Sequence, residues 1–229
     1  MLQPATDQLV SHLTPLPSDP NVISVRVGRR AVARLRAAEV EQLAIEVGRP
    51  WTEDLAHKAA RIKQVEKTRQ HAFRLLSKRG YSRNELADRL KRFTDDSDIA
   101  GEILDELEEN HWVDDEAYAR IIAEDTLRAK PLAVGLLIEL LIRRQIDEDL
   151  ARSVAHETLR GVDPVASAER LARDHQKKQS DQPPVVIARR IWGVLHRRGF
   201  DEQTIETVLH RLNIPYEGSP DGLRGPSIV

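Results

Sequence analysis

The sequence predicts an all-α protein of three tandem three-helix repeats in an elongated array, preceded by a small β-hairpin and a helix. The composition is 40% apolar and 31% charged with only 4% aromatic residues, which is typical of helices packed through Leu, Ile, Val and Ala. The pattern Arg-Arg-x-apolar-Asp-Glu occurs at 143–148 and again 54 positions later, at 197–202. A fixed period of this size indicates a repeat array of short helical units.

The N-terminal region differs from the rest of the chain. Residues 1–20 contain four prolines and few apolar residues, so we expect a flexible tail. Residues 23–27 alternate apolar and polar side chains and predict a strand, and 31–35 predict its hairpin partner. Helical spacing follows at 37–47. Because a two-stranded hairpin is marginal alone, we expect this extension, 21–62, to lean on helices.

Capping residues predict where the later helices begin. Thr52 precedes a long helix that ends near Lys78, and Ser82 with Glu85 forms a capping box. Further starts are predicted at Asp95-Asp96, Asp114, Pro131, Asp147, Asp163 and Asp201. The resulting units are 63–112, 113–161 and 162–213, followed by a frayed tail at 214–229. Such arrays present a surface to another macromolecule more often than a catalytic cleft.

Charge is strongly segregated along the chain, although the net charge is only -2. Residues 58–92 carry a net +9, residues 93–125 carry -12, and residues 170–211 carry +4. Clustered cations are typical of phosphate contacts, but solvated helix faces contain them equally often. The candidate contacts to DNA or to a filament are Arg69, Arg74, Lys78, Arg79, Arg83, Arg189, Arg190, Arg197 and Arg198.

The sequence contains no recognisable catalytic motif. Cysteine is absent, no two of the eight histidines have the i, i+4 spacing of a helical zinc site, and no phosphate-binding glycine motif occurs. The acidic run 114–116 is better explained as helix capping than as a magnesium site, because consecutive helical carboxylates point in different directions. We therefore expect no catalytic residues, no cofactor, no metal and no small-molecule substrate.

The same sequence gives no membrane signal. No run approaches the ~20 apolar residues of a membrane span, and the N-terminus lacks a secretory pattern. We expect a cytoplasmic protein without a membrane partner.

One helix stands out: residues 132–142 are apolar on nearly every side. Because a surface helix needs a polar face, we expect the segment 22–47, or a second copy of the chain, to cover it.

Three segments resemble the RecX family. Residues 72–79 and 82–86 resemble its Ala-Leu-x-Leu-Leu-x-x-Arg helix and the Ser-x-x-Glu-Leu that follows. The run Asp-Asp-Glu-Ala-Tyr-Ala at 114–119 is similar to its signature, and Arg-Gly-Phe at 198–200 resembles its closing repeat. The match extends over about 67–212. Within it, we expect the ring of Tyr118 to pack against its own repeat, and Tyr81 and Phe200 to anchor the core.

The resemblance implies a non-enzymatic regulator that binds the RecA nucleoprotein filament and mainly inhibits the recombinase, with roles in DNA repair, recombination and the SOS response. Single- or double-stranded DNA is a further candidate partner. The alternative is a sequence-nonspecific DNA-binding protein without a recombinase partner. The family usually carries basic residues in the helix after Pro131, whereas 132–142 are apolar here, so we assign no DNA contact to that helix.

Overall fold

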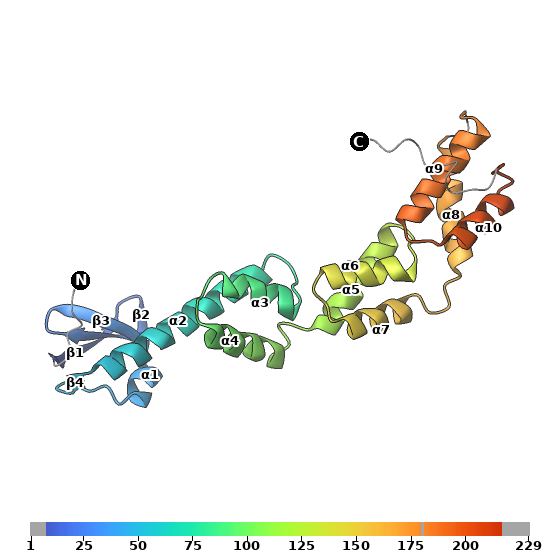
Figure 1. The fold of residues 1–229 in the computed structure, drawn as a ribbon. Coiled ribbons are helices and arrows are strands. Elements are labelled where there is room, and N and C mark those ends of the chain that lie inside the picture. The colour runs from blue at the N-terminus through green and yellow to red at the C-terminus, as the bar shows by residue number, and fades with distance from the viewer. Residues whose placement is uncertain (1–7, 180, 217–229) are drawn as a thin grey trace. The chain divides into compact units, whose positions relative to one another are not determined.

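The computed structural model describes residues 8–179 and 181–216, which form two compact units (Figure 1). The first comprises Met1–Arg79 with Leu86–Trp112, and the second Gly80–Glu85 with Val113–Val229. The described residues contain ten helices and one four-stranded sheet, so the expectation of an all-α fold is only partly right.

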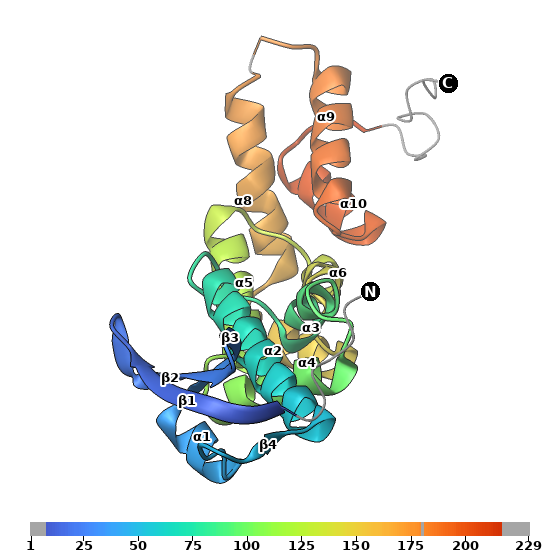
Figure 2. The same ribbon diagram turned by 90° about the vertical axis from the view of Figure 1, so that its left-hand side faces the viewer.

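The sheet lies in the first unit and is antiparallel, with strand order β3-β2-β1-β4. Its strands are β1 (Gln8–Leu16), β2 (Asp19–Val27), β3 (Arg30–Arg36) and β4 (Pro50–Trp51). The expected hairpin is confirmed as the second half of β2 paired with β3, with Val25 opposite Ala33. Figure 2 shows β1 to β3 curling beside α2 (Glu53–Leu76).

The expectation of a flexible tail over 1–20 is wrong from Gln8 onward, where β1 begins. Val10 is buried in the sheet core, which ties this strand down. Pro15 is tolerated because β4 pairs only with Gln8 and Leu9, so β1 has an open side at the proline. The register also shifts between Pro15 and Leu16. Pro15 therefore marks an irregular strand end.

The hairpin leans on helices, as expected. α1 (Ala37–Gln42) and the first turns of α2 pack on the sheet. α1 is shorter than the predicted 37–47, because Ala44 adopts a left-handed conformation with φ of 49° and turns the chain so that Ile45 is buried. The core of this part consists of Val10, Val25, Val27, Leu35, Val40, Ile45, Trp51, Leu55 and Ala59.

The rest of the first unit is helical. Thr52 caps α2 by accepting a hydrogen bond from the backbone N–H of Leu55, as predicted. α3 (Arg83–Lys91) follows, and its residues from Leu86 on belong to this unit. Asp96 caps α4 (Ser97–Glu109), which packs against α2. α4 buries one apolar face along Ile99, Ile103 and Leu107.

The second unit contains six helices. They are α5 (Asp115–Ala129), α6 (Val134–Arg143), α7 (Glu148–Thr158), α8 (Pro164–Lys177), α9 (Pro184–Arg197) and α10 (Glu202–Arg211). α5 packs against α6 and α7, and α8 packs against α9 and α10. The predicted caps are confirmed at Asp114, Asp147, Asp163 and Asp201, each of which accepts a hydrogen bond from a first-turn N–H.

The apolar helix α6 is covered from within its own unit. Leu137 and Leu141 are fully buried in a cluster with α5 and α7. At its N-terminus, Ala133 donates its backbone N–H to the carbonyl of Arg198 at 2.9 Å, and Leu136 lies against Gly199. Segment 22–47 lies in the first unit, where its apolar side chains pack into the sheet core together with α2, and its covering of α6 stays a prediction.

No helix in the described part of the chain has the length and apolar character needed to span a membrane.

Candidate nucleic-acid interface

The C-terminal half of α2 places two predicted cations on one side of the helix. Arg74 is exposed, with Nη2 3.4 Å from Nδ1 of His71, and Lys78 is exposed just after the helix. Burial, and then the charges of Arg74 and Lys78, lower the pKa of His71. The His71 ring stacks on Phe93 with centroids 4.1 Å apart. The structure therefore brings Arg74 and Lys78 together beside a pair of rings.

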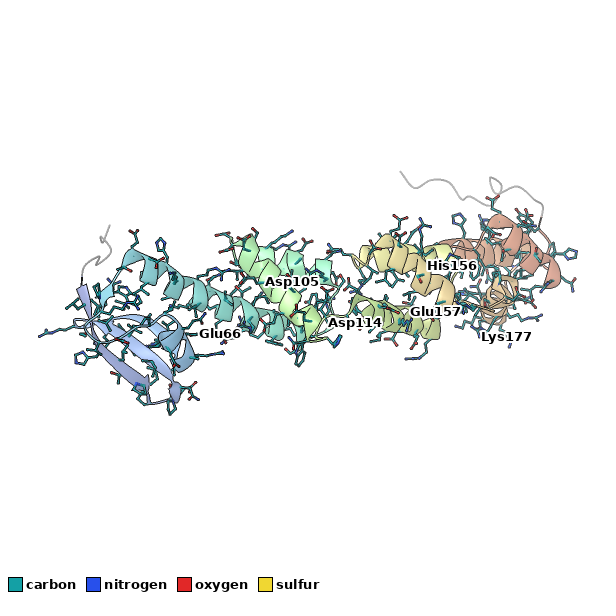
Figure 3. The ribbon with its side chains drawn as sticks, turned by 90° about the horizontal axis from the view of Figure 1, so that it is seen from below. Glu66, Asp105, Asp114, His156, Glu157 and Lys177 are labelled. Carbon is teal, nitrogen blue, oxygen red and sulfur yellow. The ribbon has the colours of Figure 1, made fainter. Side chains whose placement is uncertain are left out.

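Arg69 has a different environment. It is half-buried and its guanidinium binds both carboxylate oxygens of Glu106, with Nη2 2.8 Å from Oε2, and also Glu66 at 2.9 Å. The hydrogen bond to Glu106 raises the pKa of Arg69. Arg61 pairs likewise with Glu102. Part of the basic block on α2 is thus neutralised by the acidic block on α4, and Arg69 holds the two helices together. Figure 3 labels Glu66 on α2.

Arg79 and Arg83 complete the first predicted group. Arg79 is half-buried after the end of α2. Arg83 begins α3 within the second unit, where its backbone N–H donates to Oδ1 of Asp115 at 2.7 Å. Its neighbours are anchored similarly: the Ser82 hydroxyl donates to the carbonyl of Arg144 at 2.7 Å, and Asn84 donates to the carbonyl of Gln145. Arg83 thus belongs to the second unit, whereas Arg74 and Lys78 belong to the first.

The second predicted group lies on α9. Arg189, Arg190 and Arg197 are exposed, and Arg190 donates to Oε1 of Gln179 at 2.8 Å. Residues eight apart on a helix share a face, so Arg189 and Arg197 lie on one side. Arg198 is half-buried, and its carbonyl accepts the Ala133 N–H described above. Three of these four guanidinium groups therefore remain on the surface.

A cavity that the sequence did not predict lies in the second unit, between the end of α5 and α8. It has a volume of about 320 Å³. It is lined by Leu127, Arg128, Ala129, Lys130, Pro131, Arg170, Leu171, Asp174, His175 and Lys178. Charge counting along contiguous blocks missed this site, because its cations come from segments about 40 residues apart. The only sequence signal is the spacing of Arg170, Asp174 and Lys178, which puts all three on one helix face.

The aromatic residues divide between core and surface. Tyr81 and Phe200 are buried, as expected. The prediction for Tyr118 is confirmed, since its ring packs on the core of α5, α6 and α7. The same ring lies over Gly80, where an added Cβ would come within 2.8 Å of Cε2. By contrast, Trp112 is 61% exposed and makes an edge-on contact with Phe73 at 5.3 Å.

Among the residues that the structure describes, no cluster of three or more His, Asp or Glu side chains has the arrangement needed to hold a metal ion.

Comparison with known proteins decides the family. No model of a known protein family matches the chain. The regulatory protein RecX of Chromobacterium violaceum is 34% identical over 140 residues, which are 60% of this chain and 86% of that protein. RecX of Mycolicibacterium vanbaalenii is 31% identical over 162 residues, 67% of this chain and 86% of that protein. The chain belongs to the RecX family. The proteins of this family are regulatory and not enzymes, which confirms the expected absence of catalysis.

Solved RecX structures agree in fold. A crystal structure of a regulatory protein RecX covers 89% of this chain and 99% of its own length, with a TM-score of 0.70 and 16% identity. RecX from Lactobacillus salivarius covers 67% of this chain and 99% of its own, with a TM-score of 0.57 and 19% identity. The mostly helical architecture is therefore a RecX-like fold.

Proposed function

We propose that this protein binds the RecA nucleoprotein filament and mainly inhibits the recombinase. The observation that carries the proposal is membership of the RecX family, shown by the 34% identity over 140 residues to RecX of Chromobacterium violaceum. The partner itself follows from what that resemblance implies. The protein acts by stoichiometric binding, since its family is one of regulators.

The helical packing supports a surface for a large partner. In each of three successive helix triplets, the first helix packs against the third: α2 against α4, α5 against α7, and α8 against α10. We therefore propose three tandem units at 63–112, 113–161 and 162–213. Repeated units of this kind present binding surfaces to macromolecules.

The charge distribution suits a filament that contains both protein and DNA. Arg74, Lys78 and the cations of α9 are exposed and offer contacts to phosphate, while much of the acidic block remains on the surface of α4 and α5. A partner that carries both signs of charge can engage both components of the filament. Arg69 is left out of this surface because Glu106 and Glu66 occupy it.

The test is inhibition of RecA strand exchange and ATP hydrolysis, measured over a salt series together with binding of the protein to naked DNA. Attraction to bare phosphate decays steeply with salt. We expect inhibition to persist at a salt concentration that abolishes binding to naked DNA. If inhibition disappears in step with DNA binding, the protein acts as a nonspecific DNA-binding protein and the proposal is wrong.

A further inference from the structure

We propose that the cavity between α5 and α8 is a phosphate-binding site, and that its ligand is a backbone phosphate of DNA. That the ligand is DNA rests on the proposed function, whereas the site itself rests on the structure. The two can fail separately, because DNA binding is measured without RecA.

The charges in the cavity are unbalanced. Its walls carry the cations Arg128, Lys130, Arg170 and Lys178 against one carboxylate, Asp174. Arg128 pairs with Asp125, which lies outside the lining, at 2.9 Å. Among the described residues, the side chains of Lys130, Arg170 and Lys178 form no hydrogen bond or ion pair. Three cations without an ion pair therefore line one small concavity that holds a single carboxylate, Asp174.

These cations converge and do not merely share a surface. His175 lies in the lining, and its pKa is lowered by burial first, and then by the charges of Lys178, Lys130 and Arg197. Asp174 acts in the opposite direction, more weakly than burial, Lys178 and Lys130 but more strongly than Arg197. The charges that lower the pKa of His175 therefore come from three elements: the α5–α6 turn, α8 and α9. Repulsion among like charges held together in this way is relieved by a bound anion.

The backbone at Lys130 is fixed on both sides. Proline disfavours helical geometry in the residue before it, and Lys130 is extended with φ of -162° and ψ of 146°. Leu132 is buried in the core of α5 to α7. Ala133 is hydrogen-bonded to Arg198. The turn therefore presents Lys130 opposite α8 without needing to be ordered on binding, which favours affinity.

Phosphate fits this set of donors better than a carboxylate does. It offers several strong acceptor oxygens in a compact group, and lysine ammonium groups bind it as point charges from separate directions. Arg170 adds a planar donor group on the α8 wall. Contacts of this type position a protein on the DNA backbone without reading its sequence. The site therefore predicts binding that depends on salt and is indifferent to base sequence.

The test compares two double variants of the full chain that each remove two positive charges from the second unit. The first, Lys130→Gln with Lys178→Gln, alters the cavity. The control, Arg160→Gln with Lys177→Gln, alters exposed residues outside the lining; Lys177 is labelled in Figure 3. Binding to single-stranded oligonucleotide is measured as a function of salt, and thermal melting confirms that both variants fold. Arg170→Gln is a third variant, should the first fail to fold.

We expect the magnitude of the slope of log affinity against log salt to fall by about 0.7 in the cavity variant relative to the control, since one phosphate contact to a single strand is lost. The imidazole signals of His175 in NMR supply a second measurement. A bound phosphate offsets the neighbouring cations, so DNA should raise the pKa of His175 in the natural protein and not in the cavity variant. An oligonucleotide with a neutral methylphosphonate backbone should leave it unchanged.

The proposal is overturned if the two variants show equal slopes of log affinity against log salt and the His175 signals do not change when DNA is added. The cations would then be only solvated. A His175 response to inorganic phosphate but not to oligonucleotide would overturn the assignment to DNA. If the cavity variant behaves as expected while the natural protein fails to inhibit RecA, the site stands and the proposed function falls.

Discussion

At the scale of single residues, the contact between Gly80 and Tyr118 has a measurable cost. Gly80→Ala places a Cβ 2.8 Å from Cε2 of the Tyr118 ring, and overpacking of this kind destabilises by about 1–3 kcal/mol. Tyr118→Ala should also lower stability, by up to about 3 kcal/mol, because the ring is half-buried. In the Tyr118→Ala background, Gly80→Ala should cost much less. Urea unfolding of the four proteins measures this cycle, and additive losses would contradict it.

The cations of α2 separate into a structural residue and binding residues. Arg74→Glu with Lys78→Glu should weaken DNA binding and flatten its salt dependence while leaving the melting temperature unchanged, because both side chains are exposed. Arg69→Gln should lower stability by about 1 kcal/mol or less, since it breaks an ion pair that water reaches, and should leave the salt dependence intact. A reversed pattern in these two variants would show the assignment to be wrong.

Sequence reasoning succeeds for residues whose partners are close along the chain. Thr52 and Asp114 were predicted as caps because a cap bonds to an N–H group two or three residues ahead. The sequence presents Arg69 as a candidate DNA contact because Glu106, the carboxylate that neutralises it, lies 37 residues away along the chain. The sequence likewise does not show that Lys130 and Lys178 line one cavity, because they too are far apart along the chain. The pairing or convergence of charges between helices appears only in the fold.

At the scale of elements, the helices were predictable and the sheet was predictable only in part. The pairing of β2 with β3 follows from alternation of apolar residues on either side of a tight turn. β1 was missed because Pro15 and Pro17 outweigh its short apolar pattern, although its long pairing with β2 stabilises it. β4 has two residues, and a strand of that length carries no periodicity at all.

The turn between α9 and α10 is the element that covers the N-terminus of α6. Gly199 has φ of 77°, and a Cβ there would lie 2.8 Å from the Cβ of Leu136. Gly199→Ala therefore combines backbone strain with a clash, and we expect a loss of more than about 1 kcal/mol. Leu136→Ala would keep the Cβ that clashes, whereas Leu136→Gly removes it and should relieve only the clash. Thermal unfolding of Gly199→Ala with and without Leu136→Gly, each compared with the protein that keeps Gly199, measures the two parts, and a fully stable Gly199→Ala would show that the turn does not press on α6.

At the scale of the whole molecule, the blocks of charge seen in the sequence acquire different roles. Part of the +9 and -12 blocks is neutralised in the ion pairs Arg61–Glu102 and Arg69–Glu106, which hold α2 against α4. The smaller excess at 170–211 contributes Arg170 and Lys178 to a cavity in which they stay without an ion pair. The size of a net charge along the sequence is therefore a poor guide to where a phosphate binds, because it ignores pairing in the fold.

Removing residues 1–50 tests how the N-terminal sheet serves the whole molecule. The deletion takes away β1, β2, β3 and α1, and leaves Leu55 and Ala59 of α2 without the core that buries them. We expect faster hydrogen exchange in the first turns of α2 and stronger binding of an apolar dye, because newly exposed apolar surface binds such dyes. Protection at α6 should be unchanged, since its cover lies within the second unit. Faster exchange at 132–142 after the deletion would show instead that α6 depends on the N-terminal segment.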